Sequence, residues 1–298
     1  MTSLQESNIL ALLGTDPDGF KPIEIQKLMF VFSMEVESTP SYVFMPFTFG
    51  GYSFNLSRDI HELAERHLIC ETVVGGQKRW LLTETGRVQA FAASKATSDM
   101  ITFRRRYTLR GNALTADTYR RYPYWAINST IADIILENDE KALNAIARSK
   151  PRANASFATI GYEGKVIEEY FNELLMNGIT CLCDVRRNPI SRKYGFSKST
   201  LEKACDGVGI EYVHLPQLGI PSHERERLDC QADYDALFAR YRKTTLLQER
   251  DLIAALANRV SQGERIALTC FERNPAQCHR TQVADAIARI LNDDYAVL

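Results

Sequence analysis

The feature that most constrains the fold is an alternation of short apolar runs with amphipathic stretches in the C-terminal half. Four runs are typical of strands, at residues 156–162, 179–185, 210–216 and 265–270. Helical patterns cover residues 165–178, 197–209 (with Ser197 as N-cap), 234–263 (expected as two helices) and 279–291. A β-α-β-α order gives a parallel sheet with helices on both faces. We therefore predict an α/β domain with a Rossmann-like parallel sheet over residues 155–298.

The N-terminal region, residues 1–95, shows a different pattern. A helix is expected after Pro22, then an extended aromatic run at residues 42–53, then a second helix around residues 56–64. Residues 69–83 form two strand-like runs joined at Gly75-Gly76, a hairpin signal. Helices followed by a small hairpin predict a smaller winged helix-turn-helix domain.

Between these regions, residues 96–154 form a connector with a helical stretch at residues 129–147 and a linker at residues 149–156. The segment 104–125 is basic and interleaved with aromatic residues, a pattern that suits phosphate contact and base stacking. The expected nucleic-acid-binding residues, DNA being the expected polymer, are Arg58, Arg66, Lys78, Arg79, Arg104, Arg105 and Arg106. The second helix also carries acids, so an alternative is that the winged helix contacts protein and the aromatic residues pack between domains.

Composition narrows the class of protein. The net charge of 298 residues is −1, so attraction to nucleic acid must come from local patches. No apolar run reaches the roughly 18 residues of a spanning helix, and the N-terminus lacks a signal-peptide pattern, so we expect a cytoplasmic protein without membrane contact. Seven cysteines without a C-x-x-C pair argue against a disulfide framework and a structural zinc site of usual spacing. No cofactor or metal is expected.

Polar residues follow the first two strands of the predicted sheet. The first strand leads into Gly161-Tyr162-Glu163-Gly164, where backbone N–H groups could approach an anion or where the glycines only form a tight turn. The second ends at Asp184, which could orient an arginine or act as a base. Arginines suited to phosphate oxygens follow it, Arg186, Arg187 and Arg192. The other interpretation of this segment is a surface ion-pair loop.

The last strand is followed by the densest group of reactive side chains. Cys270, Glu272, Cys278, His279 and Arg280 lie where a helix begins. A cysteine there would have a lowered pKa, and Glu272 could transfer protons. We expect anion binding by Arg280 and the helix end; a nucleophilic cysteine, or a metal held by both cysteines and His279, are alternatives. The spacing differs from the C-x5-R phosphatase loop.

On the third strand, His214 could face the site. It could equally be a hydrogen-bonded packing residue, which is the interpretation we favour.

These motifs resemble the bacterial family called domain of unknown function 488, over residues 157–291. The matching pieces are 159–162, Asp184-Val185-Arg186 with Pro189 and Ser191-Arg192, Tyr212 with His214-Leu215-Pro216 and Leu218-Gly219, and Cys270 with Glu272, Pro275 and Cys278-His279-Arg280. Ile220 replaces a usual glycine. The resemblance supports the fold and the site and supplies no reaction. Residues 44–86 resemble winged-helix domains of bacterial regulatory and toxin–antitoxin proteins.

The expected function is an enzyme, a hydrolase or transferase, acting on a phosphate-bearing ligand of the nucleotide or nucleic-acid class at the strand ends. One alternative is a DNA-binding regulator that senses a nucleotide. Another is an interaction module of a toxin–antitoxin or phage-defence system. A homodimer is the expected oligomer.

Overall fold

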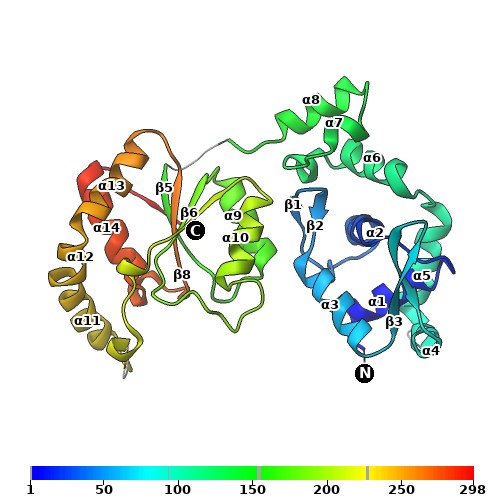
Figure 1. Ribbon diagram of the computed structural model, residues 1–298, viewed down its shortest axis with the longest axis horizontal. Coiled ribbons are helices and arrows are strands. Elements are labelled where there is room, and N and C mark those ends of the chain that lie inside the picture. Colours follow the sequence, from blue (N-terminus) through cyan, green and yellow to red (C-terminus); the bar gives the residue numbers. More distant parts are fainter. Residues whose placement is uncertain (1, 93, 153–155, 226–227) are drawn as a thin grey trace. The chain divides into compact units, whose positions relative to one another are not determined.

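The computed structural model describes residues 2–92, 94–152, 156–225 and 228–298. The chain divides into two compact units, Met1–Lys150 and Pro151–Leu298 (Figure 1). Residues 96–150, expected as a connector, lie in unit 1. Residues 153–155 of the expected linker fall outside the described residues. No helix in the described part of the chain combines the length and apolar character that a membrane crossing requires.

Unit 1 begins with the two helices and the one hairpin expected from the sequence, together with a first helix and a short hairpin that were not predicted. Its first elements are α1 Leu4–Leu13, α2 Pro22–Glu35, β1 Met45–Phe47, β2 Gly50–Tyr52, α3 Phe54–Glu65, β3 Ile69–Val74 and β4 Gln77–Leu82. Pro22 occupies the first turn of α2, where its missing N–H costs nothing. The β3–β4 turn places Gly75 and Gly76 at positive φ, as a two-residue hairpin turn requires. The antiparallel β3–β4 hairpin was therefore correctly predicted.

The remainder of unit 1 is helical. It comprises α4 Glu84–Ala92, α5 Ser94–Arg106, α6 Gly111–Arg121, the 3-10 turn η1 Pro123–Ala126, α7 Ala132–Ile135 and α8 Glu140–Arg148. The helix expected at residues 129–147 is broken because Asn138 is left-handed and Asp139 caps α8. Tyr122 and Trp125 pack edge-on against the buried ring of Phe30. These two rings thus belong to the core of unit 1, which removes them from the expected base-stacking surface.

Unit 2 contains a five-stranded, all-parallel sheet, which confirms the α/β class. Its strands are β5 Phe157–Gly161, β6 Cys181–Asp184, β7 Glu211–His214, β8 Ile266–Cys270 and β9 Ala296–Val297, in the order β7-β6-β8-β5-β9. In chain order this is 3-2-4-1-5, which differs from the 3-2-1-4-5-6 order of dinucleotide-binding folds. Alternation along the chain predicts a parallel sheet but not which strands are neighbours. β9 has only two residues, too short for a periodic signal.

Helices cover both faces of this sheet, with α9 and α10 on one side and α11 to α14 on the other (Figure 1). They are α9 Ile167–Met176, α10 Lys198–Asp206, α11 Gln231–Lys243, α12 Thr245–Gln248, α13 Arg250–Ser261 and α14 His279–Leu291, with 3-10 turns η2 Pro216–Leu218, η3 Ser222–Arg225 and η4 Pro275–Gln277. The stretch at residues 234–263 therefore belongs to three helices rather than two. Ser197 occupies the N-cap of α10, but its hydroxyl bonds to the backbone of Ser191 instead of the helix.

Candidate functional site

The loops that follow β5, β6 and β8 surround one hollow at the carboxyl edge of the unit 2 sheet. Parallel pairing sets Gly161 beside Cys270 and Asp184 beside Thr269, so these strands end at one level. The hollow has a volume of about 520 Å³, within the range of small-molecule sites. It is lined by Tyr162, Arg186, Arg187, Asn188, Ile190, Ser191, Arg192, Lys193, Ile220, Ser222, Arg225, Cys270, Phe271 and Glu272.

Positive charge predominates around this hollow. Its lining contains five cations, Arg186, Arg187, Arg192, Lys193 and Arg225, against the single carboxylate of Glu272. Two of the cations are paired, Arg186 with Asp184 and Arg225 with Glu272.

The other three cations keep donors for a ligand. Arg187 gives one N–H to the Pro216 carbonyl oxygen at 3.2 Å and is otherwise exposed. Arg192 is exposed and, among the described residues, has no hydrogen bond or ion pair. Burial lowers the pKa of Lys193, which lies over the ring of Phe196. These three side chains therefore have N–H groups that can bind an anion in the hollow.

Asp184 and Arg186 form a buried ion pair behind the hollow. The Asp184 carboxylate accepts from Arg186 Nε at 2.8 Å, Nη2 at 2.5 Å and the backbone N–H at 3.1 Å, and from the Tyr212 hydroxyl at 2.7 Å. Arg186 also donates to the Tyr162 hydroxyl and the Phe196 carbonyl. Burial opposes the charge, but Asp184 still raises the pKa of Arg186 above its usual value. Asp184 thus orients an arginine. Its carboxylate oxygens already accept four hydrogen bonds, so it is not free to act as a general base.

Tyr162 supports this network. Its ring stacks on Phe196 with centroids 4.4 Å apart, and the guanidinium of Arg186 lies over the ring at 5.1 Å. Of the two alternatives for residues 161–164, the contacts of the first N–H groups favour the tight turn. The N–H groups of Tyr162 and Glu163 donate to the carbonyl oxygens of Cys270 and Phe271, and the Glu163 carboxylate accepts from the Arg273 N–H at 2.9 Å. The turn therefore ties β5 to the loop after β8.

Gly161 and Arg280 both contact the backbone of the loop after β8. A Cβ atom on Gly161 would lie 2.1 Å from the Glu272 carbonyl oxygen, so only glycine fits there. Arg280 is fully buried and donates to the carbonyl oxygens of Glu272 and Arg273. Contrary to the expected anion-binding role, its donors point at the backbone and it does not line the hollow.

Cys270, Cys278, His279 and Glu272 converge beside the hollow. Both thiols lie 3.0 Å from Glu272 Oε2, and Cys270 Sγ lies 3.8 Å from His279 Nδ1. A hydrogen bond from Cys278 lowers the pKa of Cys270 against the effect of burial, whereas burial raises the pKa of Cys278. Of the two thiols, only Cys270 reaches the hollow, and it is the better candidate nucleophile.

His214 is a packing residue in this geometry. Its Nε2 lies 2.9 Å from the Arg186 carbonyl oxygen, and the residue does not line the hollow.

The cations expected to contact nucleic acid in unit 1 are mostly engaged within that unit. Arg58 pairs with Asp59 and Glu62, Arg66 with Glu6, and Lys78 with Glu71 at 2.9 Å. Arg79 and Arg104 donate to backbone carbonyl oxygens. Only Arg105 and Arg106 of the expected set are exposed and have no partner among the described residues.

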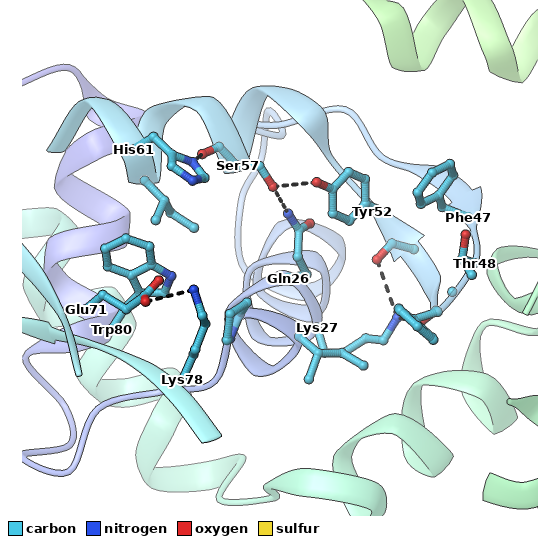
Figure 2. A pocket seen from close by; sticks show the side chains of 16 residues that line it. Gln26, Lys27, Phe47, Thr48, Tyr52, Ser57, His61, Glu71, Lys78 and Trp80 are labelled. Carbon is cyan, nitrogen blue, oxygen red and sulfur yellow. Dashed lines mark hydrogen bonds and ion pairs between the residues drawn. The ribbon is translucent and has the colours of Figure 1, made fainter. Parts of the chain in front are cut away.

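Unit 1 contains a second cavity, of about 550 Å³, between α2, α3 and the two hairpins (Figure 2). Its walls are largely apolar and aromatic, with Phe47, Tyr52 and Trp80 among them. Lys27 is buried on one side, where it donates to the Phe49 and Gly51 carbonyl oxygens. Burial lowers the pKa of Lys27 to about 7.

Three of these features escaped the sequence analysis. Lys27 lies in the apolar spacing of α2 and gave no signal. Tyr212 was named only as part of the family resemblance, without a role. Arg225 lies beyond the third strand in a segment without periodicity, and only its place in the fold reveals that it contacts Glu272.

Comparison with protein families agrees with this description of unit 2. The family model described as domain of unknown function DUF488 matches residues 166–287. Comparisons with curated proteins and with solved structures gave no match. The matched segment includes three of the five strands, β6, β7 and β8, with the loops that follow them, and leaves out β5 and the turn after it. The C-terminal unit of this chain therefore matches the DUF488 family over residues 166–287.

Proposed function

We propose that unit 2 binds a phosphate-bearing ligand of the nucleotide or nucleic-acid class in the hollow at its strand ends and acts on it as a hydrolase or transferase. The observation that supports this proposal is the excess of cations, five against one carboxylate, around a concave site of ligand size. Arginine side chains match phosphate oxygens through paired N–H groups. Such a site suits a dianion better than an apolar or cationic ligand.

Each group has a distinct role in this proposal. Arg187, Arg192 and Lys193 bind the phosphate, because their donors are not consumed by the protein. Arg186 contributes positive electrostatic potential to the hollow, but its donors are held by Asp184. Cys270 and Glu272 are the reactive groups that reach the hollow, so they are the ones that can approach the scissile bond.

We further propose that unit 1 is a winged-helix domain. Its order α1, α2, α3 and then the β3–β4 hairpin suits that fold, and Phe20, between α1 and α2, forms an antiparallel bridge with Trp80 of β4. The β1–β2 hairpin is then an insertion between α2 and α3. Since the cations of α3 are paired, DNA contact in this proposal falls to Arg105 and Arg106 at the end of α5, and a DNA-binding regulator remains the alternative function.

Calorimetric titration of the full chain tests ligand binding. The probes are inorganic phosphate, AMP, ATP and a short single-stranded DNA. We expect at least one nucleotide to bind and Arg192→Ala to weaken it about ten- to hundredfold, as loss of a charged hydrogen bond does. Arg289→Ala, an exposed arginine on α14 outside the hollow, is the matched control and should bind normally. Absence of binding for every probe contradicts the proposal.

Turnover separates an enzyme from a sensor. Phosphate release and strand cleavage should fall on the order of 100-fold in Glu272→Gln if that carboxylate serves the reaction. Binding without turnover on any probe, together with salt-sensitive binding of a specific duplex that Arg105→Ala and Arg106→Ala weaken, would instead favour the regulator.

A further inference from the structure

Four potential metal ligands come together between the end of β8 and the start of α14. They are the sulfurs of Cys270 and Cys278, a ring nitrogen of His279 and a carboxylate oxygen of Glu272. The ligand atoms of the two cysteines and His279 all lie within 4.8 Å of one another, and all three residues are buried. Glu272 Oε2 lies 3.0 Å from each sulfur. Two sulfurs, one imidazole and one carboxylate form a donor set that zinc prefers.

The orientation of His279 fits a ligand. Its Nε2 lies 2.9 Å from the carbonyl oxygen of Val185, which can only accept a hydrogen bond. Nε2 is therefore the donor, and Nδ1 is the ring nitrogen that faces Cys270, at 3.8 Å from its sulfur. Metal-binding histidines are commonly fixed in this way, with the distal N–H donated to a carbonyl or carboxylate.

The spacing of the four atoms is close to that of a bound site. With Zn–S near 2.3 Å, tetrahedral ligands lie roughly 3.8 Å apart. The 3.8 Å separation of Cys270 Sγ and His279 Nδ1 fits this value, and the 3.0 Å contacts to Glu272 require only a small outward shift of one carboxylate.

Arg280 sets the electrostatic surroundings of this group. Its side chain is fully buried, its Nε has no partner, and no carboxylate pairs with it among the described residues. An isolated buried cation is costly unless negative charge lies near it. Zinc held by two thiolates and one carboxylate carries a net charge of −1, the same as two thiols and one carboxylate, so the ion would add no positive charge beside Arg280 and Arg225.

We propose that Cys270, Cys278, His279 and Glu272 bind one zinc ion. Binding displaces the two thiol protons to solvent and forms four metal–ligand bonds without any change of oxidation state. Because Cys270 and Glu272 also line the hollow, the ion lies at its wall. Metal binding needs no phosphate ligand, so the proposal is independent of phosphate binding in the hollow. It assigns Cys270 and Glu272 to the ion, and while the ion is bound they do not act on the scissile bond.

A second group with metal-ligand atoms, Cys181, Glu211 and Glu264, serves as a comparison. Arg259 already donates to the sulfur and to both carboxylates there, so a guanidinium occupies the position that an ion would take. At the Cys270 group Arg225 donates to the other oxygen of Glu272, and no cation of the described residues donates to either sulfur, which distinguishes the two groups.

The test is the metal content of the full chain, purified under reducing conditions without a metal-affinity step and dialysed against zinc. Plasma mass spectrometry should give about one zinc per chain. Cobalt substitution should produce the thiolate-to-cobalt charge-transfer band and the intense visible bands of a four-coordinate site. Cys278→Ser and His279→Gln should lose zinc and the charge-transfer band. Cys205→Ala, which removes another fully buried cysteine, should keep both.

Three results would overturn the proposal. Wild-type protein could bind no stoichiometric zinc and show no thiolate–cobalt band, a result that does not depend on how the variants fold. Zinc could persist in Cys278→Ser and His279→Gln but disappear in Cys181→Ala. Mass spectrometry of the zinc-treated chain could reveal, in place of metal, a Cys270–Cys278 disulfide that was already present and that the reductant did not open. A failure of zinc binding leaves the phosphate titrations unaffected, so the two proposals fail separately.

Discussion

Replacing Asp184 with asparagine isolates the buried ion pair that supports the hollow. Asparagine keeps the shape of the side chain and removes its charge. Asp184 is fully buried and Arg186 nearly so, and four donors converge on the two carboxylate oxygens. The amide NH2 of asparagine must face Arg186 donors on one side or Arg186 Nη2 and the Tyr212 hydroxyl on the other. A donor therefore meets a donor in either orientation.

The expected cost follows from this geometry. Removing one partner of a buried pair leaves an uncompensated charge and typically destabilises a protein by about 3–5 kcal/mol. That is a large part of the roughly 5–15 kcal/mol that stabilises a domain. With a urea dependence near 2 kcal/mol per molar, the midpoint should fall by about 2 M.

Urea titration followed by far-ultraviolet circular dichroism measures this change. Both tryptophans, Trp80 and Trp125, lie in unit 1, so tryptophan fluorescence reports on that unit directly and circular dichroism on both. Asp206→Asn, at the exposed end of α10, is the control and should change stability by no more than about 0.5 kcal/mol. A loss below about 1 kcal/mol in Asp184→Asn would show that Arg186 does not depend on Asp184, and the reasoning would be refuted.

Three further changes have defined outcomes. Gly161→Ala should destabilise unit 2 by about 1–3 kcal/mol in urea titration, because its Cβ would overlap the Glu272 carbonyl. Tyr212→Phe should cost about 1.5–3 kcal/mol by the same measurement, because Asp184 loses a hydrogen bond to a charged acceptor. The folded state lowers the pKa of Lys27 from 10.5 to about 7, so the unfolded chain binds more protons between these values and the free energy of unfolding should rise with pH through that window. Lys27→Met should remove this rise in pH-dependent denaturation.

Matched controls keep these outcomes interpretable. Gly207→Ala, at a right-handed helical C-cap, should be nearly neutral. Tyr234→Phe, whose hydroxyl has no partner among the described residues, should leave stability unchanged. Similar losses in control and test variants would indicate general sensitivity of unit 2. A pH profile that Lys27→Met leaves unchanged would assign the dependence to other groups.

Much of the site was predictable because strand ends in a parallel sheet share one edge. The sequence places Asp184 and Cys270 directly after apolar runs, and the structure brings their loops to one hollow. The spacing of Cys278 and His279 after Cys270 also indicated their convergence. These inferences need only the period of each element and the rule that parallel strands end together.

The sequence could not show which arginines become buried in the folded chain. Arg186, Arg192 and Arg280 give the same signal in the sequence. In the structure Arg186 is paired with Asp184, Arg192 is exposed at the edge of the hollow, and Arg280 is buried against backbone carbonyl oxygens. That division depends on strand order and on the path of the loop after β8, which are tertiary properties. For the same reason the sequence could not show that the donors of Arg280 point at backbone carbonyl oxygens.

The position of β8 has a consequence for synthesis of the chain. β8 is the fourth strand of unit 2 along the chain, yet it lies between β5 and β6, and β5 pairs only with β8 and β9. When β5 leaves the ribosome it has no partner strand, and about a hundred residues must follow before one emerges. Its apolar residues must meanwhile be shielded by α9 or by a chaperone, so translation speed and chaperone supply should affect the yield of folded unit 2.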